Sequence, residues 1–384
     1  MADVLLTVSG VIAPDLQMQI DAAARPRADY LEMARAFDAD LLDYAGARQA
    51  SGRLGRWLEK IGGPNLLLAW SCFRRRHDYR VIFTDGEQVG LPLAALLRFL
   101  GRGRQRTLRH LMIVHILSVS KKMRLIDWLG LHRGIDLFFV YSAWQQRFIR
   151  ERWPVAPEQV VLTPFMVDAQ FFAPAQVTPQ PRPMICAVGL EFRAYPTLIQ
   201  AVDGLDVELV IAAASPWSKR SDSSADQSLP DNVTVRRFSQ FDLRQVYADS
   251  LFTVMPLYGV NFQAGVTAIL EAMAMERAVI CSRTPGQTDV IVDEETGLYV
   301  PPEDVDALRA AIRRLLADPE LAQRMGRAGR ERVQSDMSLT HYVRRLNKYV
   351  QQARATDSGL DAHGPGRGKE ASAPLSQLMT DEPR

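Results

Sequence analysis

The segment richest in potential chemistry runs from Asn261 to Met275 and reads NFQAGVTAILEAMAM. An apolar run precedes it, so Gly265 is expected in the loop between a strand and a helix. Free backbone N–H groups at the start of such a helix, together with its dipole, bind phosphate groups. Glycine also lets a ligand approach the backbone closely. The candidate phosphate-binding residues are therefore Ala264, Gly265, Val266 and Thr267.

Glu271 lies one helical turn beyond Thr267, on the same predicted face. A carboxylate at this place can accept hydrogen bonds from two hydroxyls of a ribose. A buried helix in which Glu271 pairs with a nearby cation explains the same spacing. The pattern by itself favours neither interpretation.

This segment resembles the signature of family 4 glycosyltransferases, in which a Glu, seven residues and a second Glu flank the site of a nucleotide-sugar donor. Glu271 matches the second acid. The first acid falls on Gln263, which keeps hydrogen-bonding capacity for a sugar but loses the charge. The resemblance continues through AVICS, GQTDVI and TGLYVPP, covers residues 184–333, and is diffuse in the N-terminal half.

The resemblance also implies cations that hold the donor diphosphate. Arg193 follows the predicted strand 184–188 and its glycine, and a guanidinium suits bidentate phosphate contact. The position after Gly189, often Arg in the family, is Leu190 here. Lys219, after another predicted strand, is the second candidate. An exposed loop position is the alternative explanation for Arg193.

Three more candidates follow predicted strands in the N-terminal half. His115 ends the run LMIVH, and family 4 enzymes are similar in placing a His there that faces the donor sugar. His115 and Glu271 are therefore the candidate catalytic residues, although a core histidine is the alternative for His115. Asp85 and Glu87 suit acceptor hydroxyls or acid–base chemistry, and a capped turn explains them equally well.

No metal site and no cofactor are expected beyond the co-substrate, a UDP- or GDP-linked sugar. Cys72, Cys186 and Cys281 are too far apart in sequence for a metal or redox motif. Asp38 and Asp40 are predicted at a solvated helix end. The resemblance implies chemistry without a metal, because an arginine and a helix start supply the positive charge.

Net charge is only +2, but cations outnumber anions more than two to one between Ser51 and Val160. Few aromatic residues interleave with these cations, which argues against nucleic-acid binding. A solvated face, contact with an anionic membrane surface and a phosphorylated acceptor all remain as explanations. The cations that define the stretch are Arg98, Arg102, Arg104, Arg106, Arg109, Lys121 and Lys122.

No uncharged apolar run reaches the roughly 18–20 residues of a membrane span. The N-terminus lacks the basic region of a signal peptide. An odd number of cysteines without a disulfide pattern is typical of a reducing compartment. We therefore expect a cytoplasmic protein, with peripheral contact at the inner face of the membrane as an option.

Strands alternating with helices in both halves predict two doubly wound, Rossmann-like α/β domains facing a cleft, which is the GT-B fold that the resemblance implies. We expect an acceptor-binding domain at residues 1–172 and a nucleotide-sugar-binding domain at 184–336. Between them, residues 173–183 form a Pro-rich linker. The resemblance implies that a helix at 337–353 crosses back to the first domain, and we expect residues 354–384 to form a disordered tail.

The resemblance implies a hexosyltransferase-type glycosyltransferase (EC 2.4) that acts with retention and without a metal. The acceptor is unidentified, with a lipid-linked acceptor or a glycan as the candidates. Two alternatives stay open. One is another GT-B reaction, such as epimerisation or hydrolysis of a sugar nucleotide. The other is a catalytically silent nucleotide-sugar-binding protein, which Gln263 and Leu190 motivate.

Overall fold

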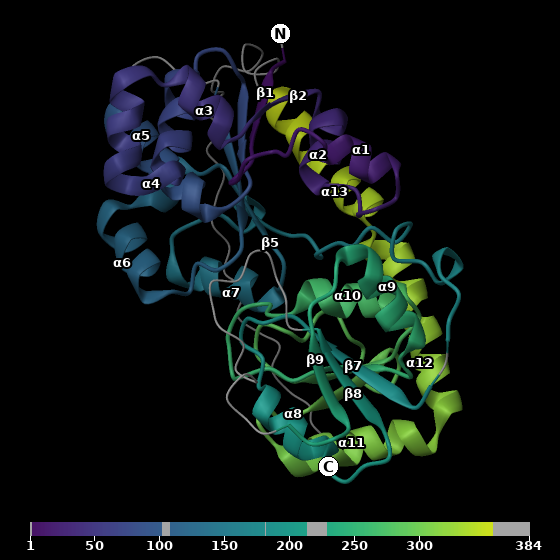
Figure 1. Cartoon of the computed structure of the whole chain (residues 1–384). Helices are drawn as coiled ribbons and strands as arrows, with labels where there is room; N and C mark the ends of the chain where they lie inside the picture. Colours follow the sequence, from purple (N-terminus) through teal and green to yellow (C-terminus); the bar gives the residue numbers. More distant parts are fainter. Residues whose placement is uncertain (1, 102–107, 181, 213–228, 356–384) are drawn as a thin grey trace, which may run out of the picture.

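The computed structural model describes residues 2–101, 108–180, 182–212 and 229–355. These residues form two parallel six-stranded sheets, one in each half of the chain (Figure 1). The predicted fold, two doubly wound α/β domains of the GT-B type, is confirmed. Lys219, Arg102, Arg104, Arg106 and the predicted tail beyond residue 355 lie outside the described residues.

The first sheet is parallel throughout, and its strands are nearly uninterrupted apolar runs because helices cover both faces. In spatial order it contains β2 (Ala39–Leu42), β1 (Val4–Thr7), β3 (Val81–Thr84), β4 (Arg109–Val114), β5 (Leu137–Val140) and β6 (Val160–Leu162). Its helices are α1 (Leu16–Asp21), α2 (Asp29–Phe37), α3 (Tyr44–Ala50), α4 (Gly52–Arg74), α5 (Glu87–Leu100), α6 (Ser120–Leu129) and α7 (Ala143–Arg152), with single turns η1 (Leu131–Gly134) and η2 (Pro157–Gln159).

The second sheet repeats this plan. In spatial order it contains β12 (Gly297–Val300), β11 (Val279–Ser282), β10 (Thr253–Met255), β7 (Met184–Val188), β8 (Glu208–Ala212) and β9 (Val233–Arg236). The helices are α8 (Tyr195–Val202), α9 (Gln240–Asp249), α10 (Val266–Ala274), α11 (Val305–Ala317) and α12 (Pro319–Arg332), with a single turn η3 (Pro174–Gln176) before the sheet and a π-turn η4 (Val333–Met337) after α12.

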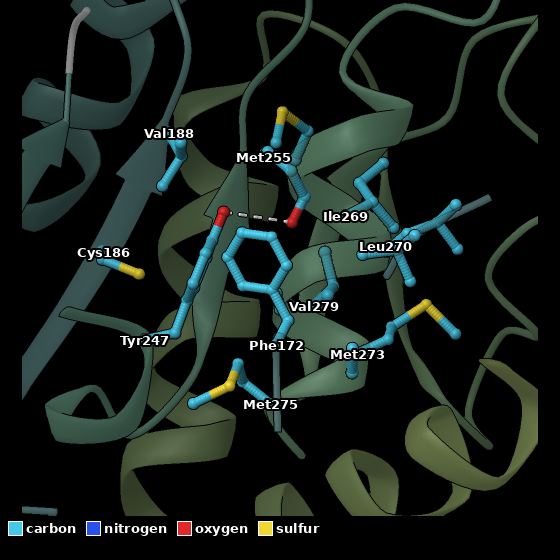
Figure 2. Packing of buried hydrophobic residues seen from close by; sticks show 14 of the residues in the cluster. Phe172, Cys186, Val188, Tyr247, Met255, Ile269, Leu270, Met273, Met275 and Val279 are labelled. Atoms are coloured by element: carbon cyan, nitrogen blue, oxygen red, sulfur yellow. Dashed lines mark hydrogen bonds between the residues drawn. The ribbon is translucent and has the colours of Figure 1, made fainter. Parts of the chain in front are cut away.

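Alternate residues of each strand face opposite cores. On one side of the second sheet, α9 and α10 bury their apolar faces, and Figure 2 shows Tyr247 of α9 packed edge-on against Phe172, with ring centroids 6.3 Å apart. On the other side, α8, α11 and α12 form a separate core with the remaining strand residues. The second sheet is thereby buried on both faces.

The last helix, α13 (Leu339–Ala355), crosses back and lies against α2 of the first domain (Figure 1). Its buried side chains join the core on one face of the first sheet: Leu339, Tyr342, Val343, Leu346 and Val350. The Tyr342 hydroxyl lies 3.2 Å from that of Tyr141. The amphipathic stripe expected in this helix therefore packs on the first domain.

The two chain crossings between the domains lie side by side. The Val167 amide donates to the Met337 carbonyl (3.1 Å), and the Leu339 amide donates to the Val167 carbonyl (2.8 Å). Phe171 and Phe172 already pack in the second core. The chain thus enters the second domain before the predicted linker at 173–183, because Phe171 and Phe172 bury their rings in the core of that domain.

Asp38 and Asp40, predicted at a solvated helix end, are both exposed, but only Asp38 lies at the end of the helix. Asp38 ends α2 in a left-handed conformation with φ of 52°. Asp40 then lies in the edge strand β2, where its carboxylate accepts a hydrogen bond from the Tyr79 hydroxyl at 2.8 Å. The left-handed residue ends the helix and turns the chain into the strand.

We predict that a chain ending at Asp336 melts at a much lower temperature than the full chain. Removing α13 exposes apolar surface of the first domain, and each of its five buried side chains contributes about 1.5–3 kcal/mol. A chain ending at Ala355 is the control and should melt like the full protein. Equal melting temperatures for the two shortened chains, measured by calorimetry, would show that α13 does not hold the first domain together.

Candidate functional site

Arg193 is held in a cradle of backbone at the carboxyl end of the second sheet. Its side chain is 6% exposed. Nε donates to the Val188 carbonyl at 3.0 Å and Nη1 to the Glu191 carbonyl at 2.6 Å. The guanidinium is therefore fixed in direction before any ligand arrives.

Two glycines leave the space that this guanidinium fills. Gly189 and Gly265 have φ of 103° and 76°, a region that other residues rarely adopt. A Cβ on Gly189 would overlap the Arg193 Nη2, and one on Gly265 would lie 3.3 Å from the Arg193 Cζ. The sequence requires glycine at both places for conformation and for space.

The charge of Arg193 has no carboxylate partner among the ion pairs of the described residues. Burial is the main cause that lowers the pKa of Arg193 below its ordinary value. A buried cation without a counter-ion is costly. Gly265 is also the N-cap of α10, whose free N–H groups begin at Val266. The arrangement suits an anion between the guanidinium and the start of this helix.

Glu271 lies deeper in the same region. It is 6% exposed, and its Oε2 accepts a hydrogen bond from the Tyr247 hydroxyl at 2.9 Å. Burial raises the pKa of Glu271 to about 7. The predicted partner on its helical face, Thr267, is exposed. Tyr247 comes from α9, 24 positions earlier, so no local sequence spacing could have identified it.

At the first sheet, His115 follows the carboxyl end of β4. Its ring is exposed, with Nε2 2.9 Å from the Asp85 carbonyl oxygen and the ring centroid 5.6 Å from that of Tyr141. The Gln145 amide fixes the backbone by donating to the His115 carbonyl at 2.6 Å. His115 is therefore an exposed residue of a loop whose backbone Gln145 holds, and it is not a core histidine.

Asp85 and Glu87 are engaged with the protein itself. The Asp85 carboxylate accepts from the Thr7 hydroxyl (2.6 Å) and from the amide of Ser9 (2.6 Å), and burial is the main cause that raises its pKa. Glu87 accepts from the His115 amide (2.8 Å) and from Lys122 (2.7 Å).

Burial would raise the pKa of Glu87, but the neighbouring His115 and Lys122 hold it below its ordinary value. Both carboxylates therefore brace the loops around His115. Their predicted role in acceptor binding stays a prediction.

The loop from Asn261 to Gly265 also touches the first domain. The Gln263 side-chain amide donates to the Tyr141 carbonyl at 3.3 Å, and Asn261 Oδ1 accepts from the Ser118 hydroxyl at 3.0 Å. Gln263 Oε1 is buried without a hydrogen-bond partner. The structure therefore brings Gln263 to Tyr141, the ring neighbour of His115, and leaves a buried acceptor oxygen beside this contact.

A second loop supports the first. A Cβ on Gly286 would overlap the backbone of Phe262. The fully buried Gln287 donates to the Ala264 carbonyl at 2.9 Å, and Asp289 accepts from the Ala143 amide of the first domain at 2.9 Å. The sequence showed this segment only as part of a family motif. Its contacts with the candidate phosphate-binding loop 261–265 join residues far apart in sequence, so sequence spacing does not reveal them.

Within the described part of the chain, no three His, Cys, Asp or Glu side chains lie close enough together to hold a metal ion. The expectation of metal-independent chemistry stays a prediction. No helix among the described residues is long and apolar enough to cross a membrane.

We predict that Glu271→Gln makes the ligand-free protein more stable at pH 8 but not at pH 4.5. Because the folded-state pKa is about 7 against 4.5 ordinarily, the folded protein binds the proton more tightly, and wild-type stability falls as pH rises through this window. Glutamine keeps an acceptor for Tyr247 and removes the titration. The gain at pH 8 should be on the order of 3 kcal/mol. The free energy of unfolding of both proteins is measured by urea unfolding across this pH range. If the curves for wild type and Glu271→Gln run parallel, the pKa of Glu271 is not raised in the folded protein.

The comparisons with known proteins agree with this geometry. Residues 179–332 match the family model described as Glycosyl transferases group 1. The chain is 29% identical over 186 residues to an MMP alpha-(1->4)-mannosyltransferase from Mycolicibacterium hassiacum, covering 46% of this chain and 44% of that protein. It is 34% identical over 150 residues to an alpha-maltose-1-phosphate synthase from Mycolicibacterium smegmatis, covering 35% and 38%. The chain spans less than half the length of these curated relatives.

Solved structures extend the likeness over nearly the whole chain. Sucrose-phosphate synthase from Thermosynechococcus elongatus superposes with a TM-score of 0.67 at 21% identity, covering 92% of this chain and 99% of that one. HepE from Anabaena, solved in complex with UDP-glucose, gives 0.66 at 12% identity, covering 91% and 99%. At these identities the likeness shows the fold alone. The chain therefore has the GT-B fold, and its second half carries a glycosyl transferases group 1 domain.

Proposed function

We propose that this protein is a glycosyltransferase that moves a sugar from a nucleotide-sugar donor to an acceptor bound by the first domain. The observation that carries the proposal is the buried, unpaired charge of Arg193, fixed between Gly189 and Gly265 beside the start of α10. A diphosphate is the dianion that such a site suits. The group 1 match of this domain and the mannosyltransferase among its relatives support a sugar nucleotide as the diphosphate's source.

In the proposed reaction the bond between the anomeric carbon and the diphosphate oxygen breaks, a bond to an acceptor hydroxyl oxygen forms, and the proton of that hydroxyl passes to the leaving diphosphate. Arg193 and the amides at the start of α10 stabilise the charge that develops on the leaving diphosphate. This fixed positive charge makes a metal ion unnecessary, so transfer should persist in excess chelator. We propose retention of anomeric configuration on the family resemblance alone.

The other site residues take supporting roles. Tyr247 holds one oxygen of the Glu271 carboxylate, and the other is proposed to accept the ribose hydroxyls. His115 is proposed to hydrogen-bond a hydroxyl of the donor sugar, because its exposed ring borders Tyr141 and thereby the loop of Gln263. UDP- and GDP-linked sugars are the donors to screen first. The proposed acceptor class is a lipid-linked molecule or a glycan, and vesicle sedimentation tests the proposed contact with anionic membrane.

Arg193→Met should weaken binding of the nucleoside diphosphate by about 1.5–3 kcal/mol, the size of a hydrogen bond to a charged group, and transfer should fall with it. Arg314→Met is the matched control, because this exposed arginine in the last turn of α11 pairs with Glu294 and, among the described residues, forms no hydrogen bond or ion pair with Arg193 or α10. Calorimetry with UDP and GDP measures the affinity, and product analysis with and without EDTA separates transfer from hydrolysis or epimerisation. Unchanged affinity in folded Arg193→Met would remove this residue from the donor site.

Gln263→Glu should lower transfer while leaving the affinity for free UDP or GDP within about threefold. The wild-type amide donates to the Tyr141 carbonyl. An ionised carboxylate at this position has no proton to donate, so its oxygens repel the carbonyl oxygen. The domains then lose a contact that closes the cleft around the sugar.

Asn261→Asp is a matched control for this change. It makes the same amide-to-carboxylate replacement on the same loop but keeps the Oδ1 that accepts from Ser118. Asn261→Asp should therefore retain most of the transfer activity. Equal turnover of Gln263→Glu and the wild type would show that the amide does not serve closure.

A further inference from the structure

A pocket of about 320 Å³ opens on the first domain at the end of its sheet opposite His115. The lining residues His110, Gly134 and Asp136 place it at the amino ends of β4 and β5, whereas His115 follows the carboxyl end of β4. Six strand residues separate the two ends, which is about 20 Å at the usual rise per residue. The pocket is therefore remote from the proposed donor site.

The lining of this pocket is strongly basic. Arg76, Arg98 and Arg133 contribute to its wall together with the buried His110. Neither Arg98 nor Arg133 forms an ion pair with a carboxylate within the part of the chain that the structure describes. Clustered guanidinium groups without counter-charge create a positive potential that attracts an anion.

The single carboxylate in the wall does not cancel this charge. Asp136 Oδ1 accepts from Arg109 at 2.9 Å, and its Oδ2 accepts from the His110 backbone amide at 2.8 Å. The His110 ring is also engaged, with Nδ1 2.9 Å from the Gly134 carbonyl oxygen. The Asp136 and His110 side chains are thus engaged with the protein itself, and among the described side chains neither forms an ion pair with Arg98 or Arg133.

Two of the arginines are held in position by the fold. The Arg76 guanidinium lies 4.0 Å from the Phe73 ring centroid and donates to the Phe73 carbonyl at 2.8 Å. Arg98, in the last turn of α5, packs beside Gly130, where an added Cβ would lie 3.4 Å from its Nη2. Gly130 has φ of 58° and ends α6. A pocket whose cations are already ordered loses less entropy on binding.

We propose that this pocket binds a phosphate group at a site separate from the nucleotide-sugar cleft. Arginine forks suit the geometry of phosphate oxygens. The volume is at the small end of ligand pockets, which fits a phosphomonoester or the headgroup phosphate of a lipid. The exposed Phe99 ring lies with its centroid 5.7 Å from the Cζ of the lining residue Arg98, so an apolar chain attached to the phosphate also has a surface to lie on.

The test compares wild type with the double variant Arg98→Met/Arg133→Met, and uses Arg124→Met, an exposed arginine of α6 outside the pocket, as the control. Calorimetry with inorganic phosphate and glycerol 3-phosphate probes the soluble source. Flotation with vesicles of phosphatidic acid in phosphatidylcholine, against phosphatidylcholine alone, probes the lipid source. Binding of UDP reports on the nucleotide-sugar cleft in the same samples.

We expect the double variant to lose at least tenfold in affinity for one of the two phosphate sources, with Arg124→Met and UDP binding unchanged. Loss toward the soluble probes alone identifies a small phosphate ester, and loss toward vesicles alone identifies a headgroup. If the double variant matches wild type with both sources, the pocket is not a phosphate site. If UDP binding falls in parallel, the site is not separate. Failure of the donor experiments with Arg193 would leave this result unaffected.

Discussion

The buried charge of Arg193 is the constraint on which the rest of the second domain depends. A guanidinium that is 6% exposed and paired only with backbone carbonyls is held at a cost in the ligand-free protein. Glycine at 189 and 265 is needed to make room for it, and the second of these glycines also starts α10. The loop conformation, the start of α10 and the proposed phosphate site therefore depend on one cluster of contacts, and the proposed binding function accounts for this cost.

The same loop couples that cluster to the other domain. Gly265 touches Arg193, while Gln263, two residues earlier, donates to the Tyr141 carbonyl of the first domain. Gln287 holds the loop from behind through the Ala264 carbonyl. A ligand that moves this loop must therefore alter the contact between the domains. The two chain crossings between the domains are themselves joined by a β-bridge between Val167 and Ser338.

Sequence periodicity predicted the two α/β domains and the amphipathic last helix, because long amphipathic patterns depend little on tertiary context. The family resemblance supplied the expectations that this helix crosses back and that Arg193 and Glu271 belong to one donor site. Tyr247 was missed, since its contact with Glu271 depends on how α9 packs on α10. The Phe171–Phe172 pair was read as part of the first domain because prolines dominate the composition of the next segment, while burial decides where the second domain begins. Asp85 and Glu87 were recognisable as strand-end carboxylates, but only coordinates show that protein donors occupy them.

The most direct test of the central claim is the melting temperature of Arg193→Met with and without saturating UDP. If Arg193 is a buried cation awaiting a diphosphate, the variant should melt a few degrees higher than wild type when ligand-free, because an uncompensated charge has been removed. With UDP the order should reverse, because ligand stabilisation depends on affinity. A variant that melts below wild type without ligand and gains as much from UDP as wild type does would contradict the account.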